Sequence, residues 1–416
     1  MMDFPPEELL GLDMPCFVFN EAELEANLLS FKEATERAWA GRVVMGFSVK
    51  TTPVARLIKL ANDLGYYAEV VSDEEYDLAL RSGVPPAQIV FNGPIKSHDW
   101  LEYALAQGAI VNLDSWREVE WTAEYAERTG TAPSVGLRVN FDLEREMPGE
   151  TMAGAEGVRF GFCFENGFFK RAVDHLRGHG IEPVGLHVHF STKGHLARTY
   201  EIVATILCQI CDECQLDSLT YIDMGGGYYG GGSNKGRYDE YALAMTGVLS
   251  KRFDPALVTL VIEPGGSVLC TPCSYAGHAI GVNEVRGRRF IVTELTKLNM
   301  NSTVFARRGF AHEIIRLGER RGAVPIQTIC GYTCIEMDRL LDLEDEEEIR
   351  PGDLICLANA GAYTISFSPG FFIKNPPAIY LRGKRGDYTK LSGCEHPSAP
   401  QCQWTQNNRK AGGHGR

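Results

Sequence analysis

The stretch VGLHVHFSTKGHLARTYEIVATILCQICDECQLDSLTYIDMGGG, residues 184–227, decides the fold. Residues 184–190 form an apolar run with the length of a buried strand, and residues 219–224 form a second such run. Residues 195–216, between them, carry apolar side chains at helical spacing. A strand, a helix and a second strand in this order predict two parallel strands joined by a helical crossover.

This strand–helix unit repeats through the first two thirds of the chain. Apolar runs lie at residues 43–49, 66–71, 89–91, 109–113, 134–139, 184–190, 219–224 and 258–262. Helical stretches lie between them at residues 53–63, 73–81, 97–107, 115–128 and 195–216. Eight such units predict an α/β fold of the (β/α)8 TIM barrel type, which needs about 250 residues, and an open doubly wound sheet is the alternative.

A β-rich part follows the barrel. Short strand-like runs replace the helical pattern after Pro264, at residues 290–295, 326–330, 353–357 and 378–382. The acidic run 341–350 is expected to be a solvated loop, and the strand-like PCFVFN at 15–20 is expected to pair with the β-rich part. We predict an N-terminal segment (1–30) that packs on the β domain, a barrel (31–270), a β-rich domain (271–392) and a disordered polar tail (393–416).

The composition excludes several classes of function. The net charge of −13 argues against nucleic acid and anionic membranes as partners, although backbone amides can still hold an anionic cofactor. The 12 cysteines are scattered, and Cys211-x-x-Cys214 lies in a helical stretch without a second pair, so we predict no metal site. No signal peptide and no apolar run of about 18 residues is seen, so we expect a cytoplasmic protein with free thiols.

The ends of the barrel strands carry the candidate chemical groups. Lys50 closes the first run, where its amine would enter the barrel mouth; burial would lower its pKa, which suits a Schiff base. A snorkelling surface lysine is the alternative. His187 and His189 share one face of a later strand. Metal ligation lacks a third ligand nearby, so stacking of His189 on an aromatic cofactor is the alternative.

Two further strand ends carry polar or glycine residues. Gly225, Gly226 and Gly227 follow the seventh run, and glycines let backbone amides approach a phosphate closely. Glu263 follows the eighth run, where it could pair with a protonated ring nitrogen or form an ion pair at the barrel rim.

Together these segments resemble the fold-type III pyridoxal-phosphate decarboxylases, the family of the ornithine/arginine and diaminopimelate decarboxylases. The matching pieces are FSVK (47–50), EVVSDEE (69–75), FNGPIKS (91–97), GLHVHFST (185–192), IDMGGG (222–227), IEPGGS (262–267), GYTC (331–334) and GAYT (361–364). The resemblance implies an alanine-racemase-like barrel with a C-terminal β domain joined by the N-terminal strand. It also implies pyridoxal 5'-phosphate as cofactor and a homodimer with a composite active site.

The resemblance also implies roles for individual residues. The cofactor contacts would be made by Lys50 (Schiff base), His189 (stacking), Gly225, Gly226, Gly227, Thr192 and Tyr363 (phosphate), Glu263 (ring nitrogen), Glu69 and Glu75 (near the Schiff base) and Arg138 (near the cofactor face). Cys334, presented by the second subunit, would return a proton to the substrate after CO2 is lost. The implied activity is decarboxylation of an amino acid or an amino-acid-derived substrate.

Two departures from the family pattern bear on the substrate. The family usually reads EPGR where this chain has Glu263-Pro264-Gly265-Gly266. The residue after the catalytic cysteine is usually acidic in diamine-forming members, whereas this chain has Ile335, which would leave a distal ammonium unpaired. These changes are more similar to members from specialised metabolism, including those that act on aminoacyl groups tethered to a carrier protein.

Two other functions remain open on the sequence alone. One is an amino-acid racemase, although racemases of this fold pair the ring nitrogen with arginine and lack the cysteine segment. The other is a non-catalytic, antizyme-inhibitor-like protein that binds the cofactor. Such proteins usually lose the lysine, the cysteine or the phosphate glycines, and this chain has all three.

Overall fold

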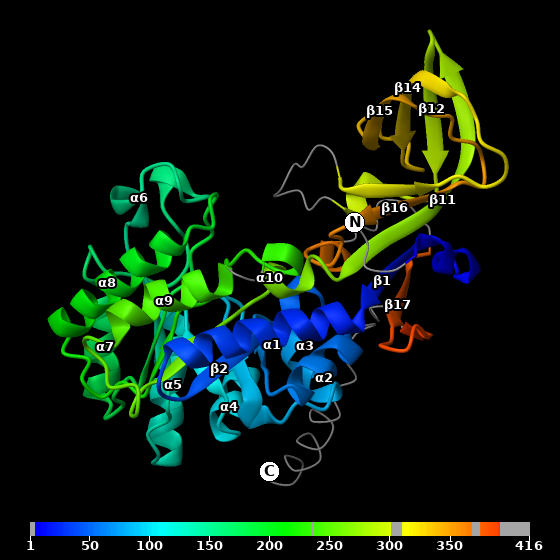
Figure 1. The fold of residues 1–416 in the computed structure, drawn as a ribbon. Helices are drawn as coiled ribbons and strands as arrows, with labels where there is room; N and C mark the ends of the chain where they lie inside the picture. The colour runs from blue at the N-terminus through cyan, green and yellow to red at the C-terminus, as the bar shows by residue number, and fades with distance from the viewer. Residues whose placement is uncertain (1–4, 235–236, 301–309, 368–374, 392–416) are drawn as a thin grey trace, which may run out of the picture.

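The computed structural model describes residues 5–234, 237–300, 310–367 and 375–391. Figure 1 shows two parts, a barrel surrounded by helices and a β-rich part that extends from one end of it. Both parts were expected from the sequence.

The barrel contains eight parallel strands: β2 (Val43–Ser48), β3 (Tyr67–Val70), β4 (Ile89–Phe91), β5 (Ile110–Leu113), β6 (Gly136–Asn140), β8 (Gly185–His187), β9 (Tyr221–Asp223) and β10 (Thr259–Ile262). β7 (Phe162–Cys163) extends the sheet beside β6. The sheet closes because β2 pairs with both β3 and β10, and β5 pairs with β6. The predicted TIM barrel is confirmed, and the open doubly wound sheet is wrong.

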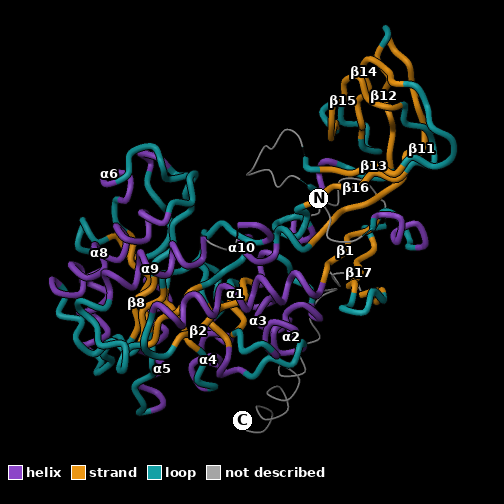
Figure 2. Tube along the Cα trace, viewed as in Figure 1, coloured by secondary structure: helices purple, strands orange, loops and turns teal. Residues whose placement is uncertain are grey.

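Helices cover the outside of the barrel (Figure 2). They are α1 (Glu21–Ala38), α2 (Ala55–Asp63), α3 (Asp73–Arg81), α4 (His98–Ala106), α5 (Trp116–Thr129), α7 (Phe168–Gly178), α8 (Ala197–Glu213) and α9 (Arg237–Leu249). Two short helices, α6 (Leu143–Glu146) and α10 (Gly266–Leu269), follow β6 and β10 in the chain. Several begin at a capping side chain; Ser72, for example, accepts a hydrogen bond from the Glu75 backbone nitrogen at 3.2 Å. The spacing of buried Phe169, Ala172, Val173 and Leu176 turns one face of α7 toward the core.

The inside of the barrel is packed. Val44, Val90, Tyr221 and Val261 form one buried cluster, in which β4 and β9 contribute although they are not neighbours in the sheet. These side chains therefore meet across the barrel. A Cβ at Gly185 would lie 1.9 Å from the Tyr221 ring, so this glycine is required by the aromatic ring that fills the interior.

The β-rich part contains β1 (Cys16–Asn20), β11 (Cys273–Val285), β12 (Arg288–Thr293), β13 (His312–Ile315), β14 (Ala323–Cys330), β15 (Arg339–Glu347), β16 (Leu354–Ala358), β17 (Ala378–Arg382) and β18 (Tyr388–Leu391). β1 lies between β11, to which it is antiparallel, and β17, to which it is parallel. The Phe17 and Tyr275 rings stack across the first pair at 4.5 Å. The N-terminal strand therefore belongs to this sheet, as expected.

The acidic run 341–350 was predicted to be a solvated loop, and this was wrong. Most of it belongs to β15, which pairs with β14 along its length. Leu341 and Leu343 are buried while Asp342 and Glu344 are exposed, so the run has the alternation of a half-buried strand. The acidic side chains occupy the solvent face.

The predicted domain limits at residues 30, 270 and 392 stay predictions, and the tail 393–416 lies outside the described residues. α1 crosses the first limit and packs against β2 and α9 of the barrel. In the described part of the chain, no helix combines the length and apolar character that a membrane crossing requires. The cytoplasmic location also stays a prediction.

A buried ion pair fixes the loop after β4. The Lys96 Nζ donates to the Gly93 carbonyl at 2.7 Å and contacts Glu118 Oε2 at 3.0 Å, and both charged side chains are fully buried. We expect Lys96→Met to lower the free energy of unfolding in urea by about 3–5 kcal/mol, because it leaves a buried carboxylate unpaired. Lys170→Met, which breaks an exposed pair with Asp174, should cost less than about 1 kcal/mol. Equal losses in the two variants would contradict this account.

Candidate active site

A cavity of about 770 Å³ lies at the carboxyl ends of the barrel strands, where it also reaches β11 and β16 of the β-rich part. Seven of the residues predicted for the site line it: Lys50, His189, Thr192, Gly226, Gly227, Glu263 and Tyr363. Five others do not line it: Glu69, Glu75, Arg138, Gly225 and Cys334. Glu69 contacts Lys50, Arg138 contacts His189 and Gly225 adjoins Gly226, whereas Cys334 lies in the β-rich part.

Lys50 lies in a short 3-10 turn (Val49–Thr51) that directly follows β2. Its Nζ is 2.5 Å from Glu69 Oε2, and the Ser48 hydroxyl donates to the same oxygen at 2.8 Å. Burial works to lower the pKa of Lys50, but the charges of Glu69, Tyr363 and Glu263 outweigh it and raise this pKa above its usual value. The expected lowering of the lysine pKa is therefore wrong, because the Glu69 carboxylate, which the resemblance placed near the Schiff base, lies against the amine and its charge outweighs burial.

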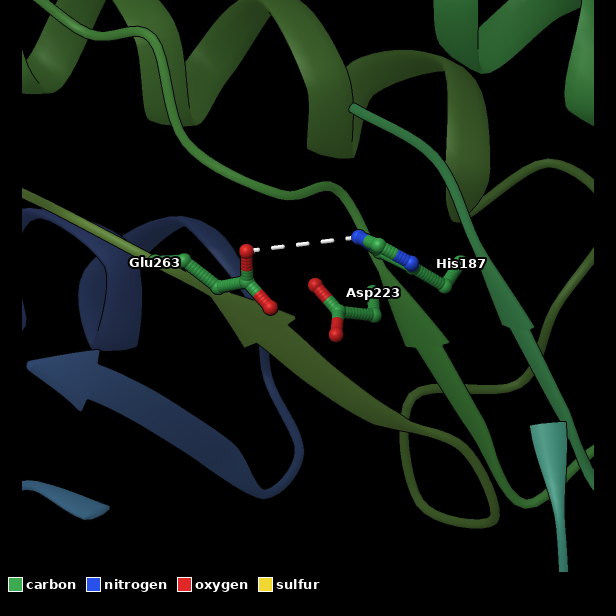
Figure 3. Close-up of side chains that lie close together, drawn as sticks. All are labelled: His187, Asp223 and Glu263. Carbon is green, nitrogen blue, oxygen red and sulfur yellow. Dashed lines mark ion pairs between the residues drawn. The ribbon is translucent and has the colours of Figure 1, made fainter. Parts of the chain in front are cut away.

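His187, Asp223 and Glu263 form a buried cluster inside the barrel mouth (Figure 3). Their nearest side-chain ligand atoms all lie within 4.8 Å of one another, and His187 Nε2 is 4.0 Å from Glu263 Oε2. His187 is opposite Asp223 in the β8–β9 register, and Glu263 follows the next strand, β10. No third ligand was expected near the histidines, and this was wrong for His187, because three neighbouring strands end here at the same level. The absence of a bound metal stays a prediction.

Burial controls the protonation of this cluster. It raises the pKa of Asp223 to about 7, against a hydrogen bond with Glu263 that lowers it, and it raises the pKa of Glu263 well above its usual range, where Asp223 adds to the effect. Burial lowers the pKa of His187, as do the positive charges of Arg138 and Lys96, and neither ring nitrogen has a hydrogen-bond partner among the described residues. The cluster therefore binds its protons on the carboxyl groups, and a cation beside Glu263 would relieve its unfavourable charge.

Two asparagines that the sequence analysis missed connect the site. Asn92 Nδ2 donates to Glu69 Oε1 at 3.2 Å and to Glu263 Oε1 at 2.5 Å. Asn112 Nδ2 donates to Asn92 Oδ1 at 2.9 Å and to Asp223 Oδ2 at 3.0 Å. Their position in or directly after an apolar strand could have indicated a role at the barrel mouth. The network links Lys50, through Glu69 and Asn92, to Glu263.

The loop after β9 requires its glycines. Gly225 has a left-handed φ of +64°, and a Cβ there would lie 2.4 Å from the Val188 carbonyl oxygen. A Cβ at Gly226 would lie 2.6 Å from the Glu263 carbonyl oxygen. Side chains are thus excluded from both positions, and the loop backbone can border the cavity at Gly226 and Gly227.

His189 borders the same loop and is neutral. Its Nδ1 accepts a hydrogen bond from the Gly226 backbone nitrogen at 3.0 Å. Burial, together with the nearby charges of Arg138 and Lys50, lowers the pKa of His189 to about 3. Arg138 pairs with Asp114 at 2.9 Å and donates to the His189 carbonyl at 3.3 Å, so it contacts the site through the backbone of His189.

Cys334 is exposed and lies between β14 and β15 in the β-rich part, apart from the cavity of its own chain. Buried Asp338 holds this turn, because its carboxylate accepts hydrogen bonds from the Thr333 hydroxyl at 2.6 Å and from the Lys297 backbone nitrogen at 2.7 Å. The Glu336 side chain is 93% exposed, and its Oε2 lies 3.5 Å from Arg339 Nη2.

Glu75, near Lys50, supplies a pH prediction. Burial raises its pKa to about 7 from an ordinary value of 4.5, although the Val71 amide donates to it at 2.9 Å. The folded state therefore holds this proton more tightly than the unfolded chain, so stability falls as pH rises from about 4.5 to 7. We therefore expect the free energy of unfolding of Glu75→Gln, relative to that of wild type, to rise by on the order of 2 kcal/mol between pH 4 and pH 8. Urea unfolding of the cofactor-free protein measures this difference. Glu74→Gln, at an exposed neighbour, is the control; the same pH trend in both variants would refute the assignment.

Known proteins resemble this chain over most of its length. A family model described as pyridoxal-dependent decarboxylase, pyridoxal binding domain, matches residues 21–269, more than half of the chain. A probable chloroplastic diaminopimelate decarboxylase of Oryza sativa subsp. japonica is 26% identical over 389 residues, which cover 91% of this chain and 76% of the relative. An L-glutamyl-(BtrI acyl-carrier protein) decarboxylase of Niallia circulans is 24% identical over 397 residues, 90% of each protein.

The fold has close relatives among solved structures. The crystal structure of the diaminopimelate decarboxylase of M. jannaschii superposes with a TM-score of 0.80 at 21% identity, and the match covers 95% of this chain and 94% of that chain. The likeness therefore includes the barrel and the β-rich part together.

Proposed function

The chain belongs to the pyridoxal-dependent decarboxylases, and we propose that it binds pyridoxal 5'-phosphate through Lys50 and decarboxylates an amino-acid-derived substrate at a site completed by a second subunit. The family establishes the cofactor and the class of enzyme, an amino-acid carboxy-lyase. The observation that carries the residue assignment is that Lys50, Glu263, His189 and the glycine loop all border one cavity.

The residues present fit this cofactor. The glycine loop leaves no space for a Cβ at Gly225 or Gly226, as a loop that holds phosphate through its backbone requires. Burial and the charges of Asp223 and Glu69 raise the pKa of the Glu263 carboxyl group, and a protonated ring nitrogen beside it would add a compensating positive charge. Neutral His189 offers an uncharged aromatic ring in the cavity wall.

Each contact then has a proposed residue. Lys50 would form the covalent link, Glu263 would pair with the ring nitrogen, and His189 would stack on the ring. The phosphate would be held by Gly225, Gly226, Gly227, Thr192 and Tyr363. When bound, pyridoxal phosphate supplies an electron-withdrawing ring that accepts the electron pair left by departing CO2.

The protein residues around Lys50 orient it and control its protons. Glu69 holds the Lys50 amine, and Asn92 fixes both Glu69 and Glu263 through one amide nitrogen. Because Arg138 holds the backbone of His189, the stacking ring is held indirectly by the Arg138–Asp114 pair. Lys50 and Glu263 are thus parts of one pre-arranged polar network.

The proton that replaces CO2 at the substrate Cα would come from Cys334 of the partner subunit. This is supported by the exposure of Cys334, its rigid turn and its separation from the cavity of its own chain. A homodimer in which each β-rich part faces the other barrel would bring the two together.

The substrate is proposed to be an amino acid or aminoacyl group without a distal ammonium, including one tethered to a carrier protein in specialised metabolism. Ile335 is apolar and cannot pair with a distal ammonium, and Glu336 already pairs with Arg339 of its own chain. The relative from Niallia circulans is named for a carrier-bound glutamyl substrate, which is a precedent for such a substrate in a similar protein.

A CO2-release screen tests the reaction and the substrate together. The purified protein with added cofactor is offered meso-diaminopimelate, ornithine, lysine, arginine, glutamate and glutamyl thioesters of a carrier protein. We expect CO2 release with the thioester or with glutamate to exceed that with the diamino acids. Deuterium incorporation at Cα without CO2 release would indicate a racemase, and absence of both with every substrate would favour a non-catalytic binding protein.

A further inference from the structure

His195 occupies a strained position beside the glycine loop. It lies between β8 and α8 with a left-handed φ of 46°, which a non-glycine residue adopts only at a cost. Its carbonyl oxygen accepts hydrogen bonds from Arg237 Nη2 at 3.1 Å and from the Tyr241 hydroxyl. Two side chains of α9 therefore keep the residue in this conformation.

A hydrogen bond also orients the ring of His195. Its Nδ1 lies 2.6 Å from the Gly227 carbonyl oxygen. A carbonyl oxygen can only accept, so Nδ1 must carry the hydrogen, and Nε2 can donate to another partner only when the ring takes up a second proton. His195 borders the cavity next to Gly226 and Gly227.

The cavity has few groups that can meet an anion. Among the described residues that line it, only Lys50, His189 and His195 have side chains that can become cationic. Lys50 is paired with Glu69, and His189 uses Nδ1 to accept from Gly226 and is neutral. Of these three, His195 is therefore the side chain that borders the glycine loop and holds no carboxylate partner or backbone donor at its Nε2 among the described contacts.

We propose that His195 Nε2 binds the phosphate of the cofactor, an inference that rests on the proposed function. A phosphate monoester carries a charge of roughly −1.5 to −2 near pH 7, and a charged donor binds it more strongly than backbone amides alone. Position 266 is open, since a Cβ at Gly266 would meet only the Ala362 Cβ, at 3.8 Å. Bound phosphate would favour the protonated ring of His195, which would then supply in this cavity the charge that a basic side chain at 266 could supply.

The test compares two ligands that differ only in phosphate. The full-length protein is freed of cofactor, and the dissociation constants of pyridoxal phosphate and pyridoxal are measured by absorbance. His195→Asn is the variant, because asparagine tolerates a left-handed φ and keeps a donor for the Gly227 carbonyl while it removes Nε2. Lys193→Ala, which removes an exposed cation two residues away, is the control.

We expect His195→Asn to weaken binding of pyridoxal phosphate by roughly tenfold to a hundredfold, and that of pyridoxal by less than about threefold. Gly266→Arg in the same variant should restore binding of pyridoxal phosphate alone, and Lys193→Ala should change neither. Equal weakening of both ligands, or none, would overturn the role of His195. A wild-type protein that binds neither ligand would instead refute the proposed function.

Discussion

Replacing Lys50 with alanine should remove both the colour of the cofactor-bound protein and its decarboxylase activity. Lys50 is the lysine that lines the described cavity, and Glu69 holds its amine at 2.5 Å. The variant loses the covalent link and a positioned proton-transfer group together. We expect the rate to fall by at least the roughly 10²–10⁴-fold that such a group alone contributes.

The measurements are the visible absorbance spectrum and CO2 release from the substrate found in the screen. Lys59→Ala is a matched control, because it removes an exposed lysine of α2 that pairs only with Asp63, one turn along the helix. Full colour and near-normal turnover in Lys50→Ala would exclude Lys50 as the cofactor lysine. An equal loss in Lys59→Ala would mean that the loss is not specific to the cavity.

Replacing Cys334 with alanine should leave the cofactor bound and lower turnover by roughly 10²–10⁴-fold, because the site then lacks its proton donor. Cys334 lies outside the cavity of its own chain, so the variant should keep its colour. Cys330→Ala, at a partly buried cysteine four residues away in β14, should retain activity.

Mixing the two inactive variants distinguishes a composite site from a structural effect. A dimer of one Lys50→Ala chain and one Cys334→Ala chain has one site with both residues intact, so unfolding and refolding the mixture should restore activity. Each variant treated alone should stay inactive. No recovery in a mixture that still forms dimers would show that Cys334 does not act across the interface.

The barrel could be predicted because each of its units has a local signal. Residues 184–227 contain two strands and their crossover in the correct order, and the other runs repeat that pattern. β15 was missed because the prediction relied on the acidic composition and not on the alternation of apolar and acidic residues. Leu341 and Leu343 are buried between exposed acidic side chains. Composition misleads for a strand with one face in water.

The site could be predicted only in part, for a different reason. Residues at strand ends, such as Lys50 and Glu263, are visible because the fold assigns them to the barrel mouth. The contacts of Asn92 and Asn112 depend on which strands become neighbours when the sheet closes. The raised pKa of Lys50 has the same origin, since it requires the β2–β3 register that places Ser48 opposite Glu69.

The most direct test of the central claim is to identify the lysine that carries the cofactor. The purified protein with added pyridoxal phosphate is reduced with borohydride, digested, and its peptides are sequenced by mass spectrometry. This account predicts one modified residue, Lys50, and no modification in Lys50→Ala. Modification of a different lysine, or of none in a protein that has bound the cofactor, would contradict it.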